Sequence, residues 1–189
     1  MAEPRHGVVL LAAGASQRLG RPKQLVTIDG EALVCRAARL ALATEPADAV
    51  VALGAEAAAV TAALAGLAVR PLPVPDWQRG MGASLRAGLD ALSPACAGAL
   101  VVLCDQPALD AGHLAALVAS WRTAPTGAAA SAYAGVLGVP AVLPRAWFAA
   151  IDPGTDRGAR DLLRARAAKV RAVPCAGLAE DLDTPDRLP

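Results

Sequence analysis

The 189-residue sequence has few aromatic residues and almost no net charge. Aromatic side chains make up 3% of it, and 18 Lys and Arg residues balance 17 Asp and Glu residues for a formal net charge of +1. A chain with this balance has no long-range field to attract a polyanion, so nucleic acid and anionic membrane surfaces are not expected as partners. An anionic ligand would have to be held by a local group of cations.

Cysteine pairs and long apolar segments are also lacking. The four cysteines are widely separated, with no C-x-x-C pair and no nearby histidine to complete a zinc site, which favours reduced thiols and a cytoplasmic location. The apolar run Val8–Ala13 is too short for a signal peptide. Val50–Val69 is interrupted by Gly54, Glu56 and Gly66, so we expect a strand followed by an Ala-rich helix there instead of a membrane span.

Short apolar runs instead alternate with segments of helical periodicity. The runs rich in Val and Leu, typical of strands buried on both faces, are Gly7–Leu11, Asp48–Leu53, Ala68–Val74 and Gly98–Cys104. The helical segments are Glu31–Thr44, Ala57–Leu64, Ser84–Leu92 and Asp110–Trp121. This alternation predicts an α/β fold with a Rossmann-like, mostly parallel sheet and helices on both faces, in three layers.

The pattern loosens after Trp121. Ala129–Leu143 is expected to form two extended pieces around Gly135 and Gly138, and Arg157–Ala168 a further helix. At this length the chain is expected to form one domain over residues 1–189, with the last part as an appendage on the sheet.

A glycine-bearing loop, LAAGASQRLGRPK at residues 11–23, follows the first predicted strand. It leaves the carboxyl end of that strand, where open α/β sheets bind their ligands. Small residues let backbone N–H groups approach a phosphate, and Arg18 and Lys23 add two cations. The spacing fits neither the dinucleotide-binding pattern nor the Walker A pattern, so the residues alone also allow an ordinary solvated loop.

Asp105 directly follows the apolar run that ends at Cys104. Its carboxylate is therefore expected at the same edge of the sheet as the glycine-bearing loop. Mg²⁺ prefers carboxylate and phosphate oxygens, so this position suits a metal ligand. Asp105 could instead cap the helix that follows, although Asp110 is better placed for that role.

Several other residues allow two interpretations. The segment from Gly80 to Ser84 fits an anion-binding helix N-terminus or an ordinary Ser-capped helix, and Trp77 fits the core or a lid over a base. Arg157 and Arg160 belong to a basic run that suits a phosphate or a solvated helix face. Taken alone, Asp183 favours the start of a short terminal helix. The two histidines, His6 and His113, have no partner at catalytic spacing and are expected to be surface or structural residues.

The loop LAAGASQRLGRPK resembles the signature loop of the MobA-like NTP transferase family, and most closely its molybdopterin cytidylyltransferase branch. Five later segments are similar to blocks of that branch, in the same order: DWQRGMGASL at 76–85, CDQP at 104–107, GVLGVP at 135–140, RGAR at 157–160 and DLDTP at 181–185. The resemblance spans nearly the whole chain. It implies a fold of the nucleotide-diphospho-sugar transferase type, with a nucleotide-binding part at about 1–110 and an acceptor-binding part at about 111–189.

The resemblance also implies a reaction and its site. CMP would pass from CTP to the phosphate of molybdopterin, with release of pyrophosphate and with Mg²⁺ as the cofactor. The implied catalytic residues are Arg18, Lys23 and Asp105, and the implied metal ligands are Asp105 and Asp183. The implied nucleotide-binding residues are Leu11, Ala12, Ala13, Gly14, Ser16, Gly80, Gly82 and Ser84. The implied acceptor-binding residues are Gly138, Pro140, Arg157 and Arg160.

Other functions remain open at this point. The chain could be a guanylyltransferase for the same cofactor or a cytidylyltransferase for another small phosphate. It could also be a nucleotide-binding regulatory module in molybdoenzyme maturation, which has the fold without turnover and partners a molybdoenzyme maturation protein. The presence of Lys23 and Asp105 favours an enzyme. Ala12-Ala13-Gly14 resembles the cytidylyl form of the loop, whereas the guanylyl branch usually has Ala-Gly-Gly. The segment Gly138-Val139-Pro140 departs from the Gly-His-Pro of many cytidylyltransferases, so the identity of the acceptor stays open.

Overall fold

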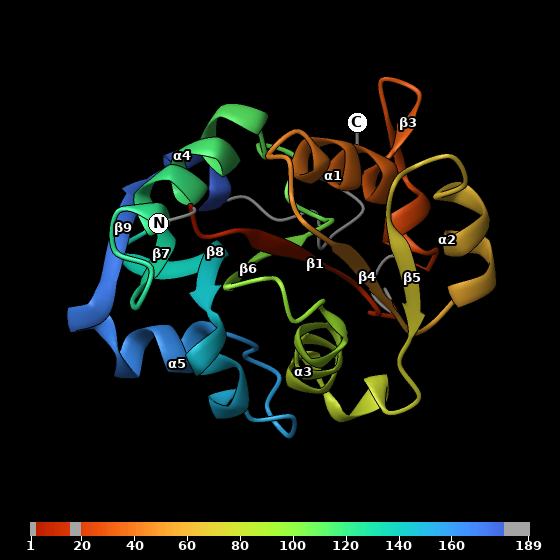
Figure 1. Ribbon diagram of the computed structural model, residues 1–189. Helices are drawn as coiled ribbons and strands as arrows, with labels where there is room; N and C mark the ends of the chain where they lie inside the picture. Colours follow the sequence, from red (N-terminus) through yellow and green to blue (C-terminus); the bar gives the residue numbers. More distant parts are fainter. Residues whose placement is uncertain (1–2, 16–19, 180–189) are drawn as a thin grey trace.

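A seven-stranded sheet forms the centre of the protein, and its strand order is β5-β4-β1-β6-β8-β7-β9 (Figure 1). The computed structural model describes residues 3–15 and 20–179. The strands are β1 (His6–Ala12), β4 (Ala49–Leu53), β5 (Arg70–Pro73), β6 (Gly98–Leu103), β7 (Ala128–Tyr133), β8 (Val136–Pro144) and β9 (Val170–Pro174). Strand β8 runs antiparallel to its neighbours β6 and β7, and the other neighbouring strands pair in parallel. This arrangement confirms the predicted Rossmann-like, mostly parallel sheet.

Helices cover both faces of the sheet, which gives the three predicted layers. They are α1 (Leu33–Leu42), α2 (Ala57–Ala63), α3 (Met81–Ala91), α4 (Ala111–Arg122) and α5 (Arg160–Ala165). One large hydrophobic cluster contains buried side chains of α1, α2 and α4, and a second large cluster contains those of α3 and α5. Figure 1 shows α1 and α4 on one side of the sheet and α3 and α5 on the other.

The central strands read as continuous apolar runs because both of their faces are buried. In β1, Val8 and Leu10 pack into the cluster under α1, α2 and α4, whereas Val9 and Leu11 pack into the cluster under α3 and α5. Successive side chains of a strand point to opposite faces, so two buried faces require apolar residues at every position. The site described below lies where these strands end.

Four features differ from the sequence-based expectations. Helix α3 begins at Met81, before Ser84, and Gly138 lies inside β8 instead of interrupting it. The last helix, α5, covers only Arg160–Ala165 of the expected Arg157–Ala168, because Leu163 is its one buried residue. Strand β9 was not predicted, since this edge strand is largely exposed and carries no continuous apolar run.

The smaller elements connect the main layers. A short hairpin of β2 (Thr27–Ile28) and β3 (Glu31–Ala32) precedes α1, and it was not predicted either. The 3₁₀ turns are η1 (Lys23–Leu25), η2 (Trp77–Arg79), η3 (Arg145–Ala150), η4 (Ala167–Lys169) and η5 (Ala176–Ala179). Within residues 3–15 and 20–179, no helix combines the length and the apolar character needed to cross a membrane. The division into nucleotide-binding and acceptor-binding parts near residue 110 stays a prediction.

Candidate functional site

Lys23 and Asp105 meet at the carboxyl edge of the sheet. Asp105 follows β6 closely, and β6 lies beside β1. Lys23 opens the 3₁₀ turn η1, after the loop that follows β1, and its Nζ forms an ion pair with Asp105 Oδ2. The two side chains are 21% and 13% exposed, so the pair is sheltered yet accessible from solvent. The structure therefore brings together a cation and an anion predicted separately, at the edge where open α/β sheets bind ligands.

Gln24 holds the backbone of the loop after β1. Its side chain is buried, and Nε2 donates hydrogen bonds to Ala12 O at 3.0 Å and Gly14 O at 2.7 Å. Ala13 O accepts a bond from Ala55 N at 3.2 Å on the side of β4. Gln24 was not predicted from the sequence, because a single amide in a loop has no periodic signal and its burial depends on tertiary contacts.

The predicted nucleotide-binding residues of this loop differ in burial. Leu11 and Ala12 end β1, and Ala13 is buried beside them. Gly14 is exposed, and a Cβ at that position would meet no atom of the described residues within 4 Å. Within the described part of the chain, no atom blocks the approach of a ligand to the Gly14 backbone. Ser16 and Arg18 lie outside the described residues.

Trp77 packs against the same loop from the side of β4. A Cβ at Gly54 would overlap Ala13 O and lie 2.5 Å from Trp77 Cγ, so only glycine lets the indole and the loop come this close. Trp77 is partly buried and packs against the cluster under α3 and α5. The structure therefore places Trp77 at the border of the core and the loop, and a lid role over a base stays a prediction.

The N-terminus of α3 is covered by the segment from Asp152 to Gly158. The Gly82 N–H donates to Thr155 O at 2.8 Å, and a Cβ at Gly82 would overlap Asp152 O. Gly80 is the N-cap residue, and no side chain of the described residues caps the helix. Ser84 is buried inside α3, so its interpretation as an N-cap is wrong. Nucleotide binding by Gly80, Gly82 and Ser84 stays a prediction.

This contact brings the RGAR block to the start of α3. A Cβ at Gly158 would lie 2.8 Å from Met81 Sδ. Arg157 and Arg160 are both exposed, and Arg157 Nη1 lies 3.5 Å from Asp161 Oδ1. Two segments separated by a long stretch of sequence, both predicted to bind substrate, therefore share one surface.

Gln106, the residue after Asp105, is hydrogen-bonded to the predicted acceptor-binding block at residues 135–140. Gln106 is buried, and its Nε2 donates to Val139 O at 3.2 Å. The Tyr133 hydroxyl donates to the same carbonyl at 3.1 Å. The Val139–Pro140 peptide bond is cis, and Gly138 precedes it in β8. The block with Gly138 and Pro140 is thus tied to the residue after Asp105.

A second buried chain of hydrogen bonds reaches Pro140 from α4. Ser131 Oγ donates to Pro140 O at 2.6 Å, and His113 Nε2 lies 2.8 Å from Ser131 Oγ. Because the Ser131 hydrogen is directed at Pro140, the His113 Nε2–H must be the donor to Ser131. Burial lowers the pKa of His113 and favours this neutral form. The structural interpretation of His113 is therefore confirmed.

The alternative role of Asp105 as a helix cap is wrong. Helix α4 is capped by Asp110, whose carboxylate accepts from His113 N at 2.9 Å. Apart from the ion pair with Lys23, Asp105 makes no hydrogen bond or ion pair within the described part of the chain. Its carboxylate is thus available to a ligand.

The thiol beside Asp105 is not a candidate for chemistry. All four cysteines are free, as predicted. Burial, with a smaller contribution from the negative charge of Asp105, raises the pKa of the Cys104 thiol to about 12. Cys104 therefore stays protonated at neutral pH, and only a thiolate acts as a metal ligand or nucleophile.

Residues 3–15 and 20–179 contain no group of three His, Cys, Asp or Glu side chains that could hold a metal ion, and Asp183 lies beyond them.

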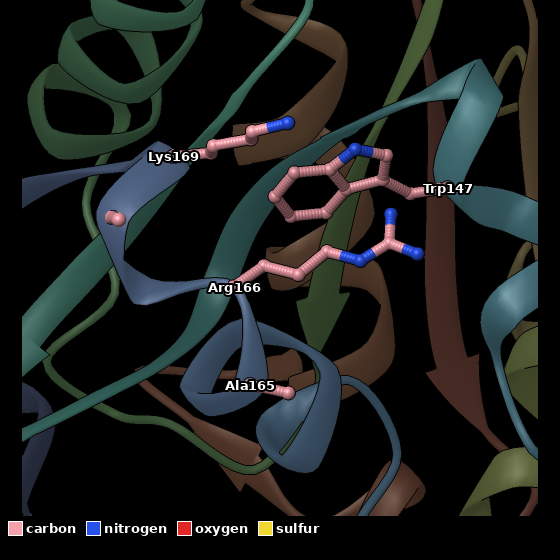
Figure 2. Close-up of a pocket in the computed structure, with 5 residues that line it drawn as sticks. Trp147, Ala165, Arg166 and Lys169 are labelled. Carbon is pink, nitrogen blue, oxygen red and sulfur yellow. The ribbon is translucent and has the colours of Figure 1, made fainter.

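A cavity of about 500 Å³ lies elsewhere, lined by Trp147, Ala165, Arg166, Ala168 and Lys169 (Figure 2). Arg166 Cζ lies 4.8 Å from the centroid of the Trp147 ring, a cation–π contact. Pro144, at the end of β8, pairs with Gly98 at the start of β6. Trp147 therefore lies toward the edge of the sheet opposite Asp105, and the cavity is separate from the candidate site.

Comparisons with known proteins place the same segments in a family. The sequence profile of the MobA-like NTP transferase domain matches residues 8–170. Nicotine blue oxidoreductase of Paenarthrobacter nicotinovorans is 37% identical over 95% of this chain and 93% of its own length. Purine catabolism protein PucB of Bacillus subtilis is 30% identical over 94% of this chain and 91% of its own length.

A solved structure agrees with the fold over the whole chain. Rv0371c of Mycobacterium tuberculosis H37Rv superimposes with a TM-score of 0.82 and 28% identity over 98% of this chain and 96% of its own. A crystal structure of Rv0371c in complex with manganese gives a TM-score of 0.75 and 26% identity over 96% and 95% of the two chains.

Proposed function

Because the chain belongs to the MobA-like NTP transferase family, we propose that it transfers CMP from CTP to the phosphate of molybdopterin and releases pyrophosphate. The observation that carries this proposal is the pairing of Lys23 with Asp105 beside the Gly14 loop. The Ala12-Ala13-Gly14 form of that loop supports CTP over GTP. Similarity of the blocks at 135–140 and 157–160 supports a molybdopterin-type acceptor.

The reaction needs no general base from the protein. The ionised phosphate of the acceptor is already a nucleophile, so the protein contributes position and charge stabilisation. In this proposal the backbone of Gly14 faces the triphosphate, and Lys23 moves from Asp105 to the departing pyrophosphate. Arg18 adds a second cation to the same group. Preorganised cations act most strongly where charge develops in the transition state.

The residues present fit a divalent metal ion. The Asp105 carboxylate supplies the hard oxygen atoms that Mg²⁺ prefers, and it has no hydrogen bond besides the pair with Lys23 among the described residues. We assign Asp105 and Asp183 as the residues that would hold Mg²⁺. Such an ion neutralises charge on the phosphates when it is bound. The manganese complex of Rv0371c supports a divalent ion in a protein of this fold.

The acceptor would lie against the second half of the chain. Arg157 and Arg160 are exposed next to the start of α3 and can receive its phosphate. Gly138 and Pro140 lie in β8, bonded through Val139 to Gln106 beside Asp105. A molybdoenzyme maturation protein would receive the product.

One assay tests the donor, the acceptor and the metal together. The protein is incubated with Mg²⁺, molybdopterin and each of the four common nucleoside triphosphates, and pyrophosphate release is measured. The expected result is release with CTP that requires both the acceptor and Mg²⁺. Release with GTP and with none of the other triphosphates would indicate the guanylyltransferase. Release only when another phosphorylated compound is supplied instead of molybdopterin would identify that compound as the acceptor. Nucleotide binding with no release for any acceptor would favour the regulatory module.

A second candidate function is oxidoreduction, because the relative that is 37% identical over 95% of this chain is named nicotine blue oxidoreductase. A loop that exposes backbone N–H groups suits the pyrophosphate of a dinucleotide as well as a triphosphate. The assay is therefore repeated with NADH or NADPH in place of the triphosphates and with nicotine blue in place of molybdopterin as the electron acceptor, and absorbance of the reduced nicotinamide is followed. Oxidation dependent on the protein and on nicotine blue, without pyrophosphate release in the first assay, would favour this second function.

A further inference from the structure

Gln24 is the most buried polar group near the proposed triphosphate. Its side chain is 1% exposed, and burial of an amide is costly unless its polar atoms are bonded. Both hydrogen bonds from Nε2 end on loop carbonyls, at Ala12 and Gly14. We propose that Gln24 is a positioning residue that holds the Gly14 loop in the shape that binds the triphosphate. This inference rests on the nucleotidyltransferase function proposed above.

Gln24 lies just beyond the point where the hydrogen bonds between β1 and β6 end. Pairing of β1 with β6 stops at Leu11 and Leu103, whereas β1 still pairs with β4 at Ala12. Ala13 O is bonded to Ala55 on the side of β4, so the carbonyls on either side of it point away from β4. The Gln24 amide supplies two donors where β6 no longer does.

These bonds also decide which backbone groups face the ligand. A carbonyl oxygen directed at a triphosphate would repel it, whereas a backbone N–H attracts it. Gln24 and Ala55 together bind the carbonyls of Ala12, Ala13 and Gly14. The loop is thus kept from turning these oxygen atoms toward the phosphates, without any contact between Gln24 and the nucleotide.

The same short turn places the catalytic cation. Lys23 and Gln24 are neighbours in η1, which is closed by bonds from Leu25 N to Pro22 O and from Val26 N to Lys23 O, both at 3.1 Å. With Gln24 anchored in the core, Lys23 is directed outward to Asp105. Loss of the anchor is therefore expected to loosen both the loop and the lysine.

The test compares Gln24→Met, which keeps the length of the side chain without its donors, with Gln24→Asn, which keeps the amide but cannot span both carbonyls. Gln78→Met is the matched control, because Gln78 is exposed in η2. Binding of each of the four Mg²⁺–nucleoside triphosphates is measured by equilibrium dialysis. For the triphosphate that the unsubstituted protein binds best, we expect Kd to rise about 10- to 100-fold in both Gln24 variants, the usual effect of losing a supporting hydrogen bond behind a ligand-binding group.

A second measurement does not depend on the nucleotide. Lys23 and Lys169 are the two lysines of the chain, so their relative rates of modification by an amine reagent can be read by mass spectrometry. The ratio of Lys23 to Lys169 modification should rise in both Gln24 variants and stay constant in Gln78→Met. A purely structural role would lower the melting temperature of the free protein while leaving this ratio and Kd unchanged, and that result overturns the inference. Unsubstituted protein that binds none of the four triphosphates would overturn the proposed function and this inference with it, whereas normal binding in all variants overturns the inference alone.

Discussion

The ammonium group of Lys23 is paired with the carboxylate of Asp105, although the two residues are 82 positions apart in the sequence. The pair forms because β1 and β6 are neighbours and both end at the same edge of the sheet. Each charge lowers the cost of keeping the other partly out of water. In the proposed reaction a triphosphate and a metal ion would take over these two partners.

Replacing Lys23 with Ala should lower turnover by about 10²–10³-fold, the usual effect of removing one preorganised charge donor. The fold should survive, because Lys23 lies on a loop edge and not in the core. Lys169→Ala removes the other lysine of the chain, on the far edge of the sheet, and should leave turnover unchanged. The measurement is pyrophosphate release at saturating substrate. Near-normal turnover in Lys23→Ala would remove its assigned role.

Replacing Asp105 with Asn should abolish metal-dependent turnover with little loss of thermal stability. The change removes one charge but keeps the shape of the side chain, and Asp105 contributes one ion pair and little packing. A titration with Mg²⁺ or Mn²⁺ is the measurement. Full activity restored by a higher metal concentration would show that Asp105 only supports the site, and coincident loss of folding would show a structural role.

Asp183→Asn tests the second proposed metal ligand. Loss of a carboxylate should raise the Mg²⁺ concentration needed for half-maximal activity, with little change in melting temperature. Asn caps a helix about as well as Asp, so a capping role predicts no change in either measurement. Asp181→Asn and Asp186→Asn in the same tail are the controls, and an equal effect of all three would show that only the total charge of the tail matters.

Ala13→Gly tests the steric account of nucleotide choice. The methyl group of Ala13 is expected to narrow the space beside the base, so its removal should reduce the preference for CTP over GTP. One methyl group in a pocket is worth about 1–3 kcal/mol, which limits the expected change in the ratio of kcat/KM values. An unchanged ratio would assign the preference to other residues, and equal use of GTP by the unsubstituted protein would contradict the CTP assignment itself.

His6 should make the protein less stable in acid. The side chain is buried at the start of β1, and its Nε2 lies 2.9 Å from Thr44 Oγ1. Burial, with a smaller effect of the Arg122 charge, lowers its pKa from 6.5 to about 4. The unfolded chain therefore takes up a proton near pH 6.5 that the native protein accepts only near pH 4, so stability is complete above pH 6.5 and falls between these values.

The His6 prediction is tested with His6→Gln, which keeps a donor near the position of Nε2. Urea unfolding is measured from pH 7.5 to pH 4. The unsubstituted protein should lose about 2–3 kcal/mol more than the variant across this range, since one unit of pKa shift corresponds to about 1.4 kcal/mol. His113 is present in both proteins and its titration cancels. Parallel stability curves would show that His6 does not carry this acid sensitivity.

Much of the fold could be predicted because its central strands are buried on both faces. The runs at β1, β4 and β6 are apolar at nearly every position, which is a strong signal in the sequence. Strand β5 was predicted as well, but it is a largely exposed edge strand and is not buried on both faces. Strand β9 has no such signal, since Val170–Pro174 is an edge strand and mostly exposed. The start of α3 was misplaced because Gly80 serves as its N-cap, and a glycine cap looks like loop sequence.

The site was predictable only where a charged residue follows a buried run. Asp105 satisfied that condition, Lys23 was predicted from the loop that follows such a run, and the structure added their direct contact. Gln24 could not be found, because its role depends on carbonyl groups left without partners where β6 ends. The packing of Thr155 on Gly82 was equally hidden, since it joins a loop to the N-terminus of α3 and no sequence periodicity links the two.

The contact between Gly82 and Thr155 has a kinetic consequence. A Cβ at Gly82 would overlap Asp152 O, so the segment from Asp152 to Gly158 packs directly against the N-terminus of α3. A nucleotide that shifts Gly80 and Gly82 would carry Arg157 with it. Donor and acceptor would then not bind independently: the KM for the acceptor would change with the concentration of the triphosphate.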